Sequence, residues 1–528
     1  MNFLNTVRAV ASMILCACAC TFGVQAQDLR IGFKAELTSA DPHVLNGANR
    51  NVWVHVYESL IAQDAQLRPV PGLALSWRML SPTAWEFRLR PGVPFQNGAP
   101  MTARDVRYSI ERAMNLQGPR TFRTYLRDVA RVRVKDALTV VVETKRLSPT
   151  LPENVGMIAI LPASLGKVDE GAFATGEAAI GTGPYRFASW SHGQKLVLLR
   201  HDNYWGAREP WGRVSFHFVP REPARAAALL SDSVDIVNDV TTHMEHAFRG
   251  YRIVSETSYM LNYLSMDQFR ARSPYVTDHG GRPLPDNPLR SRQVRQALGM
   301  AVDRDALVRH VMKRDGVASQ QLVPRGFVGH DETFRLAPHD RERARALLAQ
   351  AGYPNGFRLT VHCTNNRYLN DAKVCEAVAQ MFTRIGVRTS VSTMPFAVFQ
   401  TRAVGGGPNG EPEFSVSLLG LSAVTGNSIT PLATTIHSND KAIGAGGNNL
   451  GRYRSREVDA LIDEAAATVD AARREDLQKR AAALALGDGA ISPLLHLKAA
   501  WAMRKDLTIL PRADGFTLAM NIRPAHQP

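Results

Sequence analysis

Two strand–helix–strand units that lie far apart in the chain restrict its fold more than any other feature. Each unit has an apolar extended stretch, a helical stretch with apolar residues three and four positions apart, and a second extended stretch. Such a connection joins two parallel strands and places its helix on one face of the sheet. The segments are expected at residues 213–220, 221–231 and 234–237 in the first unit, and at 358–363, 371–385 and 387–394 in the second. Asp371 is expected to cap the helix of the second unit. Two separate sheets predict an α/β protein with two lobes.

Two extended apolar segments mark where the chain could pass between the lobes. They lie at residues 258–266 and 491–503. A chain of 528 residues is also too long for one hydrophobic core. Two crossings would leave the first lobe discontinuous and would form a hinge about which the lobes close on a ligand. We therefore expect a first lobe at 27–262, a second lobe at 263–495, and a C-terminal segment at 496–528 that completes the first lobe.

Residues 1–26 have the composition of a removable signal peptide. Arg8 is the only charged residue there, and an apolar run at 9–15 follows it. The sequence VQA at 24–26 suits cleavage before Gln27. The sequence LCAC at 15–18 loosely resembles a lipoprotein cleavage site, so a lipid anchor is the less favoured alternative. We expect the mature chain to be exported and soluble, because no other segment approaches the roughly 18 uninterrupted apolar residues of a membrane span.

The cysteines and the charges narrow the class of protein further. Three of the five cysteines lie in the leader, so Cys363 and Cys375 remain, and an exported chain can join such a pair in a disulfide.

The charge balance of the chain is basic, since Lys and Arg number 63 against 48 Asp and Glu, which gives a net charge of +15. The basic residues are scattered without a run of five, so we expect a basic solvated surface and no nucleic-acid binding.

Signatures of catalysis are missing from the sequence. It contains no G-x-S-x-G, H-E-x-x-H, Walker or G-x-G-x-x-G motif. His243 and His246 have a spacing that two metal ligands could use, but no third ligand is near in sequence, so surface histidines are the simpler interpretation. Asp303 and Asp305 are explained by a helix cap followed by a first-turn acid. We expect no enzyme activity, no metal and no cofactor.

A set of motifs in a fixed order resembles one family of proteins. The segment that resembles the signature region of the family reads LRPGVPFQNGAPMTARDVRYSIERA at 89–113. It continues an alternating strand at 85–89 and leads into a helix that Thr102 and Asp105 are placed to cap. Further segments follow the same family order along the mature chain: SADPHV, VYESLIAQD, GTGPYRF, NYWG, VRQALGMAVDRDAL, AGYPNGFRL and GRYRSREVDALIDEA. The chain resembles the extracellular solute-binding proteins of family 5, the dipeptide- and oligopeptide-type receptors of bacterial ABC importers.

The resemblance implies a two-lobed periplasmic clamp that delivers its ligand to permease subunits in the inner membrane. It places the segment at 89–113 in an extra α/β subdomain of the first lobe, at about 45–180. It also implies a monomer that binds a small molecule or short peptide. An exported hydrolase, a tethered sensor and a chaperone remain the competing classes.

By the same resemblance, ligand would contact an early first-lobe loop and the end of a second-lobe strand. Backbone groups there could pair with an extended peptide as an added strand. Arg367 follows a strand end and could hold a carboxylate with two hydrogen bonds, although an isolated loop arginine is often simply solvated. Leu419 and Leu421 could equally be strand core. The expected contact residues are Leu37, Thr38, Ser39, Asp41, Arg367, Tyr368, Leu419, Gly420, Leu421, Ser422 and Asn427.

The sequence departs from the peptide-receptor pattern in one place. Many peptide receptors have a Trp and an Asp in the stretch equivalent to LLGLSAVTGNS, and the Asp pairs with the ammonium group of the peptide. Here Leu421 and Val424 or Asn427 stand in those places, and no carboxylate occurs between Phe414 and His437. A buried ammonium group without an acidic partner is costly. The sequence therefore disfavours ordinary free-amine peptides and leaves opines, glutathione-like peptides, sugars and chelated metals as alternatives.

Overall fold

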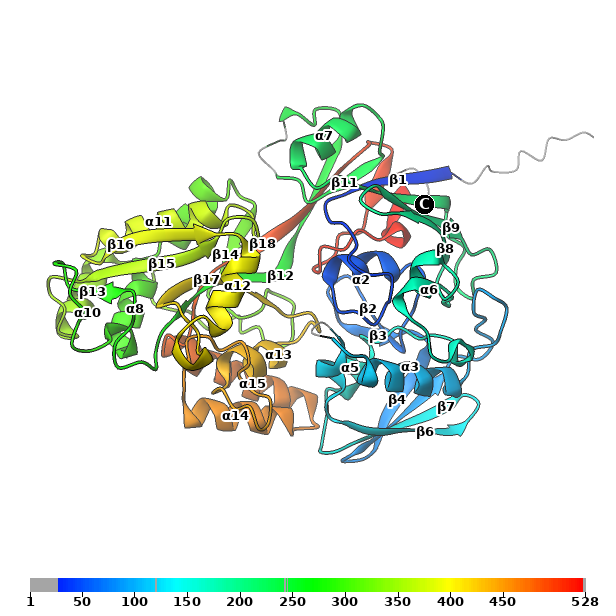
Figure 1. Ribbon diagram of the computed structural model, residues 1–528, viewed down its shortest axis with the longest axis horizontal. Helices are drawn as coiled ribbons and strands as arrows, with labels where there is room; N and C mark the ends of the chain where they lie inside the picture. The colour runs from blue at the N-terminus through cyan, green and yellow to red at the C-terminus, as the bar shows by residue number, and fades with distance from the viewer. Residues whose placement is uncertain (1–26, 119–120, 242–243, 245, 526–528) are drawn as a thin grey trace, which may run out of the picture.

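The computed structural model describes residues 27–118, 121–241, 244 and 246–525, which form two lobes side by side (Figure 1). The predicted leader with its three cysteines, and His243, lie outside these residues. Helices and strands are mixed in both lobes, which confirms the predicted α/β class. Within the described ranges, no helix has the length and apolar character needed to cross a bilayer.

One sheet of twelve strands runs through both lobes, so the prediction of two separate sheets is wrong: the crossing strands join them. Its order is β13-β15-β17-β12-β18-β11-β1-β10-β9-β8, with β14 beside β18 and β16 beside β15. The two central strands, β12 (Arg252–Met266) and β18 (Ser492–Met503), pass from one lobe to the other (Figure 1). Their pairing register shifts between Thr257 and Leu261. A break in the ladder lets paired strands bend, so this bulge is the natural hinge. Both predicted crossing segments are confirmed as strands.

The sheet of the first lobe is built around β1 (Gln27–Phe33). β10 (Trp211–Phe218) and β11 (Ile236–Asn238) are both parallel to it, one on each side. α7 (Glu222–Leu230) joins them, so the first predicted strand–helix–strand unit is confirmed with β1 inserted between its strands. Trp501 of β18 is buried in the same core. The remaining elements of this lobe are α2 (Gly47–Trp53), β2 (Ile61–Gln63), β3 (Pro69–Pro71), α6 (Glu170–Thr175), β8 (Tyr185–Ser191), β9 (Lys195–Arg200), β19 (Leu507–Ile509) and β20 (Ile522–Pro524).

A four-stranded antiparallel sheet with its own hydrophobic core extends the first lobe. Its order is β4-β5-β7-β6, and α3 (Ala103–Asn115) packs on it. The predicted capping box is present, because Asp105 accepts a hydrogen bond from the backbone N–H of Thr102 at 2.7 Å. Val106 and Ile110 bury the apolar face of α3 in this core. The other elements are β4 (Ala74–Ser81), β5 (Ala84–Leu89), α4 (Arg123–Leu126), β6 (Val129–Asp136), β7 (Thr139–Thr144) and α5 (Leu151–Val155).

The second lobe contains the second predicted strand–helix–strand unit. β15 (Arg358–Thr364), α11 (Asp371–Thr383) and β16 (Arg388–Met394) follow in order, and the two strands are parallel. Helices flank the sheet in Figure 1. The others are α8 (Arg292–Ala301), α9 (Arg304–Ala306), α10 (Arg341–Gln350), α12 (Phe396–Gly405), α13 (Ile429–Pro431), α14 (Arg456–Ala466) and α15 (Ala471–Gly487), with strands β13 (Val276–Thr277), β14 (Gly316–Ala318) and β17 (Val416–Ser422).

Two details of this unit bear on the loop between β15 and α11. Cys363 and Cys375 are joined in a disulfide that closes the loop, as the sequence predicts. The prediction that Asp371 caps α11 is wrong, because Asn370 occupies the cap position. Asp371 instead accepts hydrogen bonds from the backbone N–H groups of Arg367 at 3.0 Å and Tyr368 at 3.2 Å. The disulfide and this carboxylate together fix the conformation of the loop.

Candidate ligand-binding site

A cavity of about 850 Å³ lies between the two lobes. Its volume suits a small ligand or a short peptide. The first lobe lines it with the subdomain segments 124–128 and 146–154, and the second lobe with the end of β17, the loop after β15, α12 and the segment 429–437. The cavity therefore exists only where the lobes face each other, so relative movement of the lobes would open or close it.

The end of β17 offers an unpaired backbone edge to this cavity. β17 pairs with β12 along its whole length, from Val416 to Ser422. On its other side, β15 pairs with β17 only at Val416 and Ser417. Among the described residues, no strand covers that edge from Leu418 onward, and Leu419, Gly420, Leu421 and Ser422 all line the cavity. Backbone groups on such an edge can pair with an extended ligand.

Tyr368 and Gly420 pack directly against each other at this edge. A Cβ atom on Gly420 would lie 2.5 Å from the hydroxyl oxygen of Tyr368, so only glycine fits beneath the ring. Burial raises the pKa of the Tyr368 hydroxyl, and the Arg367 guanidinium opposes that shift. Tyr368 therefore stays protonated at neutral pH and can donate a hydrogen bond toward the cavity.

Arg367 brings a positive charge to the cavity without an acidic partner. Its guanidinium lies 4.5 Å from the ring centre of Phe396 and 5.8 Å from that of Tyr368. The aromatic faces hold the group in place. No carboxylate among the described residues forms an ion pair with it. A planar guanidinium that is oriented but unpaired is suited to bind a carboxylate through two hydrogen bonds.

The arginines of the first-lobe wall are occupied by other groups. Arg146 pairs with Asp128 at 2.9 Å, and Arg127 donates a hydrogen bond across the cleft to the carbonyl oxygen of Gly444 at 3.0 Å. Gln63 donates a second hydrogen bond between the lobes, to the carbonyl oxygen of Val424 at 2.9 Å. This wall therefore contributes contacts between the lobes and little free charge.

Arg50 of α2, which the sequence did not single out, does not line the cavity. Burial raises the pKa of Tyr125, which does line it, and the charge of Arg50 opposes that shift. Arg50 donates a hydrogen bond to Gln63 at 2.9 Å, and burial lowers the pKa of its guanidinium. Burial raises the pKa of Tyr259, and the charge of Asp514 raises it further. The positive charges of Arg50 and Arg367 lower the same pKa, so these groups share one electrostatic environment. No carboxylate forms an ion pair with Arg50 among the described residues. Only the tertiary fold brings α2 and the hinge together.

Two carboxylates line the cavity from outside the segment between Phe414 and His437. Asp128 is already paired with Arg146. Asp463 of α14 lines the cavity with its side chain 63% exposed, and it lies 3.5 Å from His437 Nε2. The segment from Phe414 to His437 has no acid, as noted, but Asp463 supplies one beside it. A ligand ammonium group could be held there.

The remaining predicted contact residues do not line this cavity, and their role in binding stays a prediction. Leu37 is buried in the first-lobe core, and Ser39 donates a hydrogen bond to Glu170 at 2.7 Å. The backbone N–H of Thr38 bonds to Asn49, and Asp41 forms a buried ion pair with Arg112 at 2.9 Å. Asn427 accepts a hydrogen bond from the backbone N–H of Ile429 at 3.0 Å. These polar groups already have partners within their own lobes.

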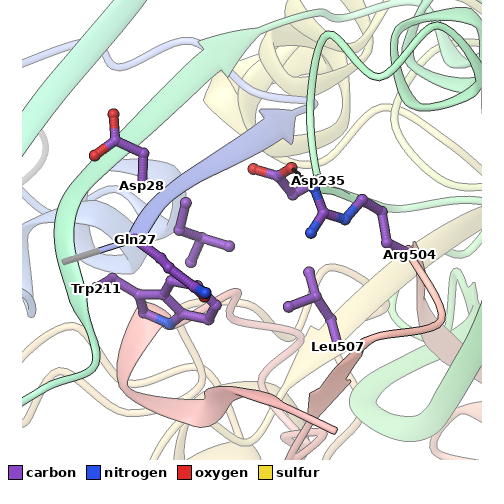
Figure 2. Close-up of a pocket in the computed structure, with 7 residues that line it drawn as sticks. Gln27, Asp28, Trp211, Asp235, Arg504 and Leu507 are labelled. Atoms are coloured by element: carbon purple, nitrogen blue, oxygen red, sulfur yellow. Dashed lines mark hydrogen bonds and ion pairs between the residues drawn. The ribbon is translucent and has the colours of Figure 1, made fainter. Parts of the chain in front are cut away.

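A smaller cavity of about 300 Å³ lies at the start of β1, away from the cleft. Figure 2 shows Asp235 and Arg504 next to each other on one side of it, with Trp211 on the opposite side. Asp235 accepts hydrogen bonds from Arg504 at 3.0 Å and from Arg30 at 2.7 Å. Its carboxylate is fully engaged, so this cavity is a poor candidate for ligand capture. Across the described part of the chain, no group of three or more His, Cys, Asp and Glu residues is placed to hold a metal ion.

The two lobes, the hinge strands and the cavity between them define a binding protein of the clamp type. The chain belongs to the bacterial extracellular solute-binding proteins of family 5, whose middle region matches residues 68–442. This confirms the resemblance seen in the sequence motifs.

Individual relatives carry names of different ligands. Heme-binding protein A of Haemophilus influenzae is 24% identical over 461 residues, covering 81% of this chain and 78% of the relative. Glutathione-binding protein GsiB of Escherichia coli K12 is 24% identical over 514 residues and 94% of each chain. The structure of AgaA with agropinic acid, from A. tumefaciens R10, superposes with a TM-score of 0.73 at 23% identity, covering 95% of this chain and 99% of that one. The last likeness establishes a shared fold.

Proposed function

We propose that this protein is the receptor of a bacterial ABC importer and captures a small polar solute that carries a carboxylate. The solute would bind in the cavity between the lobes, the lobes would close on it, and the closed form would deliver it to membrane permease subunits. The observation that carries this proposal is the unpaired guanidinium of Arg367 beside the free edge of β17. Together they offer one charged anchor and a row of backbone hydrogen-bonding groups.

The second lobe is proposed to read the acidic end of the solute. A charge-assisted hydrogen bond to Arg367 would contribute roughly 1.5–3 kcal/mol. Tyr368 would add a neutral donor, and Arg50, which lies outside the cavity lining, would add a more distant positive charge. Micromolar affinity corresponds to about −8 kcal/mol, which such an anchor and the apolar walls can supply together.

The class of solute follows from the same wall. The backbone edge of β17 suits a short peptide or a peptide-like molecule, and the absence of an acid from Phe414 to His437 favours solutes whose amine is absent or blocked. A free amine would have to reach Asp463 instead. A relative named for glutathione and a similar structure that holds agropinic acid are consistent with an acidic peptide-like or opine-like solute.

The cellular setting is proposed from the family and the leader. The family consists of extracellular binding proteins. Cleavage before Gln27 would release a mature chain into the periplasm, where it would act as a monomer without a cofactor or enzymatic activity. N-terminal sequencing of the exported protein tests the cleavage site, and a start at one of the leader cysteines would show a lipid anchor instead.

A thermal-shift screen against a solute library tests the function, because a ligand that binds only the folded state raises its unfolding temperature. We expect the strongest stabilisation from carboxylate-bearing solutes, and small-angle scattering should show compaction with each solute that stabilises the protein. The screen is repeated on Arg367→Ala and on Arg388→Ala, a matched control on an exposed position of β16 in the same lobe. Stabilisation by uncharged solutes alone, equal in all three proteins, would contradict the proposal. Turnover of a stabilising solute would indicate an enzyme.

A further inference from the structure

A second cavity, of about 310 Å³, lies within the second lobe and is separate from the ligand cleft. It is enclosed by α8, the start of α9, the segment 334–337, α10, and the turn from α15 into β18. Five arginines line it, and its lining includes no Asp or Glu. We call it the arginine pocket, and its arginines are Arg292, Arg295, Arg304, Arg335 and Arg343.

Most of these positive charges have no acidic partner nearby. Of the five arginines, only Arg292 forms an ion pair with a described residue, which is Asp488 at 3.2 Å. Arg335 donates hydrogen bonds to the backbone carbonyls of Glu332 at 2.7 Å and Phe334 at 2.8 Å. Arg343 is an exposed residue and forms no ion pair in the described part of the chain. Burial lowers the pKa of Arg295 and of Arg304, which Asp488 and Asp305 respectively oppose in part, but neither acid forms an ion pair with these two arginines among the described residues. Two further acids are committed elsewhere, since Asp340 caps α10 and Glu332 pairs with Arg325 at 2.9 Å.

Two of the arginines are buried and set a permanent positive field in the wall. Arg295 donates to the carbonyl oxygens of Asp488 and Gly489 at the carboxyl end of α15, and Arg304 donates to that of Pro493 at 2.7 Å. Carbonyl oxygens satisfy the hydrogen bonds but offer only partial charge. Burial accordingly lowers the pKa of both guanidinium groups to about 10. An anion in the pocket would relieve this cost.

The rest of the lining is apolar. Side chains of Met266, Met300, Phe334, Leu336 and Leu347 contribute to it, and Leu486 and Ile491 complete it. A volume of about 310 Å³ is small for a ligand site, which typically measures 300–1,000 Å³. Arginine-lined walls suit phosphate, because a guanidinium with free N–H groups presents a planar fork to its oxygens. The apolar lining suits a few attached carbon atoms.

We propose that the arginine pocket binds a phosphate group attached to a short apolar body. The head would lie beside Arg335 and Arg343, and the carbon atoms against the methionines and leucines. The buried pair would contribute positive charge from the wall, because their N–H groups already donate to protein acceptors. Two sources share this chemistry, a soluble organic phosphate and the phosphate head of a membrane lipid. The site is independent of the ligand cleft and of the function proposed for it.

The test compares three forms of the full mature protein. The wild type is measured beside a variant with Arg335→Ala and Arg343→Ala, two exposed changes that spare the buried pair. The matched control carries Arg358→Ala and Arg388→Ala. These two exposed arginines lie opposite each other on the neighbouring strands β15 and β16 of the same lobe. Both variants lose the same charge, so non-specific attraction falls equally. Calorimetry uses hexyl phosphate, inorganic phosphate and uncharged hexanol as probes.

We expect hexyl phosphate to bind the wild type and the control equally, and the Arg335 and Arg343 variant about tenfold or more weakly. Hexanol should not bind, and inorganic phosphate should bind less tightly than hexyl phosphate. Co-sedimentation with phosphatidylcholine vesicles, with and without phosphatidylglycerol, separates the sources. Vesicle binding by the wild type that is lost in the pocket variant identifies a lipid as the source. If the wild type binds hexyl phosphate but not the vesicles, the source is a soluble phosphate.

Two results would overturn the proposal. One is no binding of hexyl phosphate to the wild type, and the other is equal weakening in the pocket variant and the control. Cleft binding is followed in parallel with a stabilising solute from the library. Because Arg367 lies outside the arginine pocket, Arg367→Ala should leave hexyl phosphate binding unchanged, so failure at one site is distinguishable from failure at the other.

Discussion

The two walls of the cleft both carry arginines, but they use them differently. In the first lobe, Arg146 pairs with Asp128, and Arg127 donates a hydrogen bond to the carbonyl oxygen of Gly444. In the second lobe, Arg367 stacks on aromatic rings and has no acidic partner among the described residues. A paired guanidinium has little left to offer a ligand, whereas an oriented unpaired one is available. The comparison indicates that the first wall is built for stability and the second for recognition.

The largest expected effect comes from breaking the buried pair of the first lobe. Asp41→Asn would leave the buried charge of Arg112 without its partner, which should cost about 3–5 kcal/mol of unfolding free energy. Denaturant unfolding of the ligand-free protein measures this loss. Asp128→Asn, at a half-exposed pair, is the matched control and should cost less than about 1 kcal/mol. Equal losses would mean that burial does not distinguish the two pairs.

Removing the disulfide should affect the second wall in two ways. The bond closes a loop with a sequence separation of 12 that carries Arg367 and Tyr368. A variant with Cys363→Ala and Cys375→Ala should lose about 3 kcal/mol, mainly because the unfolded chain becomes less constrained. We also expect weaker solute binding, since the loop must be ordered again on binding. Chemical denaturation and calorimetry on the same samples separate the two effects. Unchanged affinity would show that Asp371 alone orders the loop.

Acidification should weaken the first lobe through His55. This histidine is fully buried, its Nε2 accepts the N–H of Ala519 at 2.9 Å, and burial lowers its pKa from 6.5 to about 4. The unfolded chain therefore takes up the proton first, so the stabilisation is complete above about pH 6.5 and is lost progressively as the pH falls to about 4.

Relative to neutral pH, the loss should reach about 2 kcal/mol at pH 5. His55→Asn should be less stable at pH 7 and should show a flatter dependence of unfolding free energy on pH. Measuring the difference between the two proteins removes the contribution of other buried histidines. An identical pH slope would assign the acid sensitivity to those other residues.

The smallest expected effect is a local change in the second wall. Gly420→Ala would force the Tyr368 ring away from β17, because the new Cβ would lie 2.6 Å from a ring carbon. We expect solute affinity to fall by about tenfold or less, with a small change in stability, since a side chain can move more easily than backbone. Ser422→Ala lines the same cavity without such a clash and should bind nearly as the wild type. Equal affinities for all three proteins would place the ligand away from this edge.

The sequence predicted the regular elements well because their signals are local. The unit from Arg358 to Met394 shows in the spacing of apolar residues, and the capping box at Thr102 shows in its two side chains. Asp371 was assigned as a cap from its position alone, whereas its actual partners, Arg367 and Tyr368, lie in a loop that has no periodic pattern.

The site was harder to predict because its charges depend on distant partners. Asp41 looks like a free acid until Arg112 is brought beside it, and Asp463 enters the cavity only through the packing of α14. Arg50 likewise shows no signal in the sequence, because its environment is formed by the hinge and the C-terminal segment. Arg367 and Tyr368 could be singled out because the end of a strand before a helix is a common ligand position.

A double-mutant cycle at Arg367 tests the recognition role of the second wall most directly. Calorimetry would compare a carboxylate-bearing solute from the library with its amide, on the wild type and on Arg367→Ala. We expect the wild type to prefer the carboxylate and the variant to lose that preference, with a coupling energy of roughly 1.5–3 kcal/mol. A coupling energy near zero, with the preference for the carboxylate unchanged in the variant, would contradict the assignment and locate the anionic anchor elsewhere in the cleft.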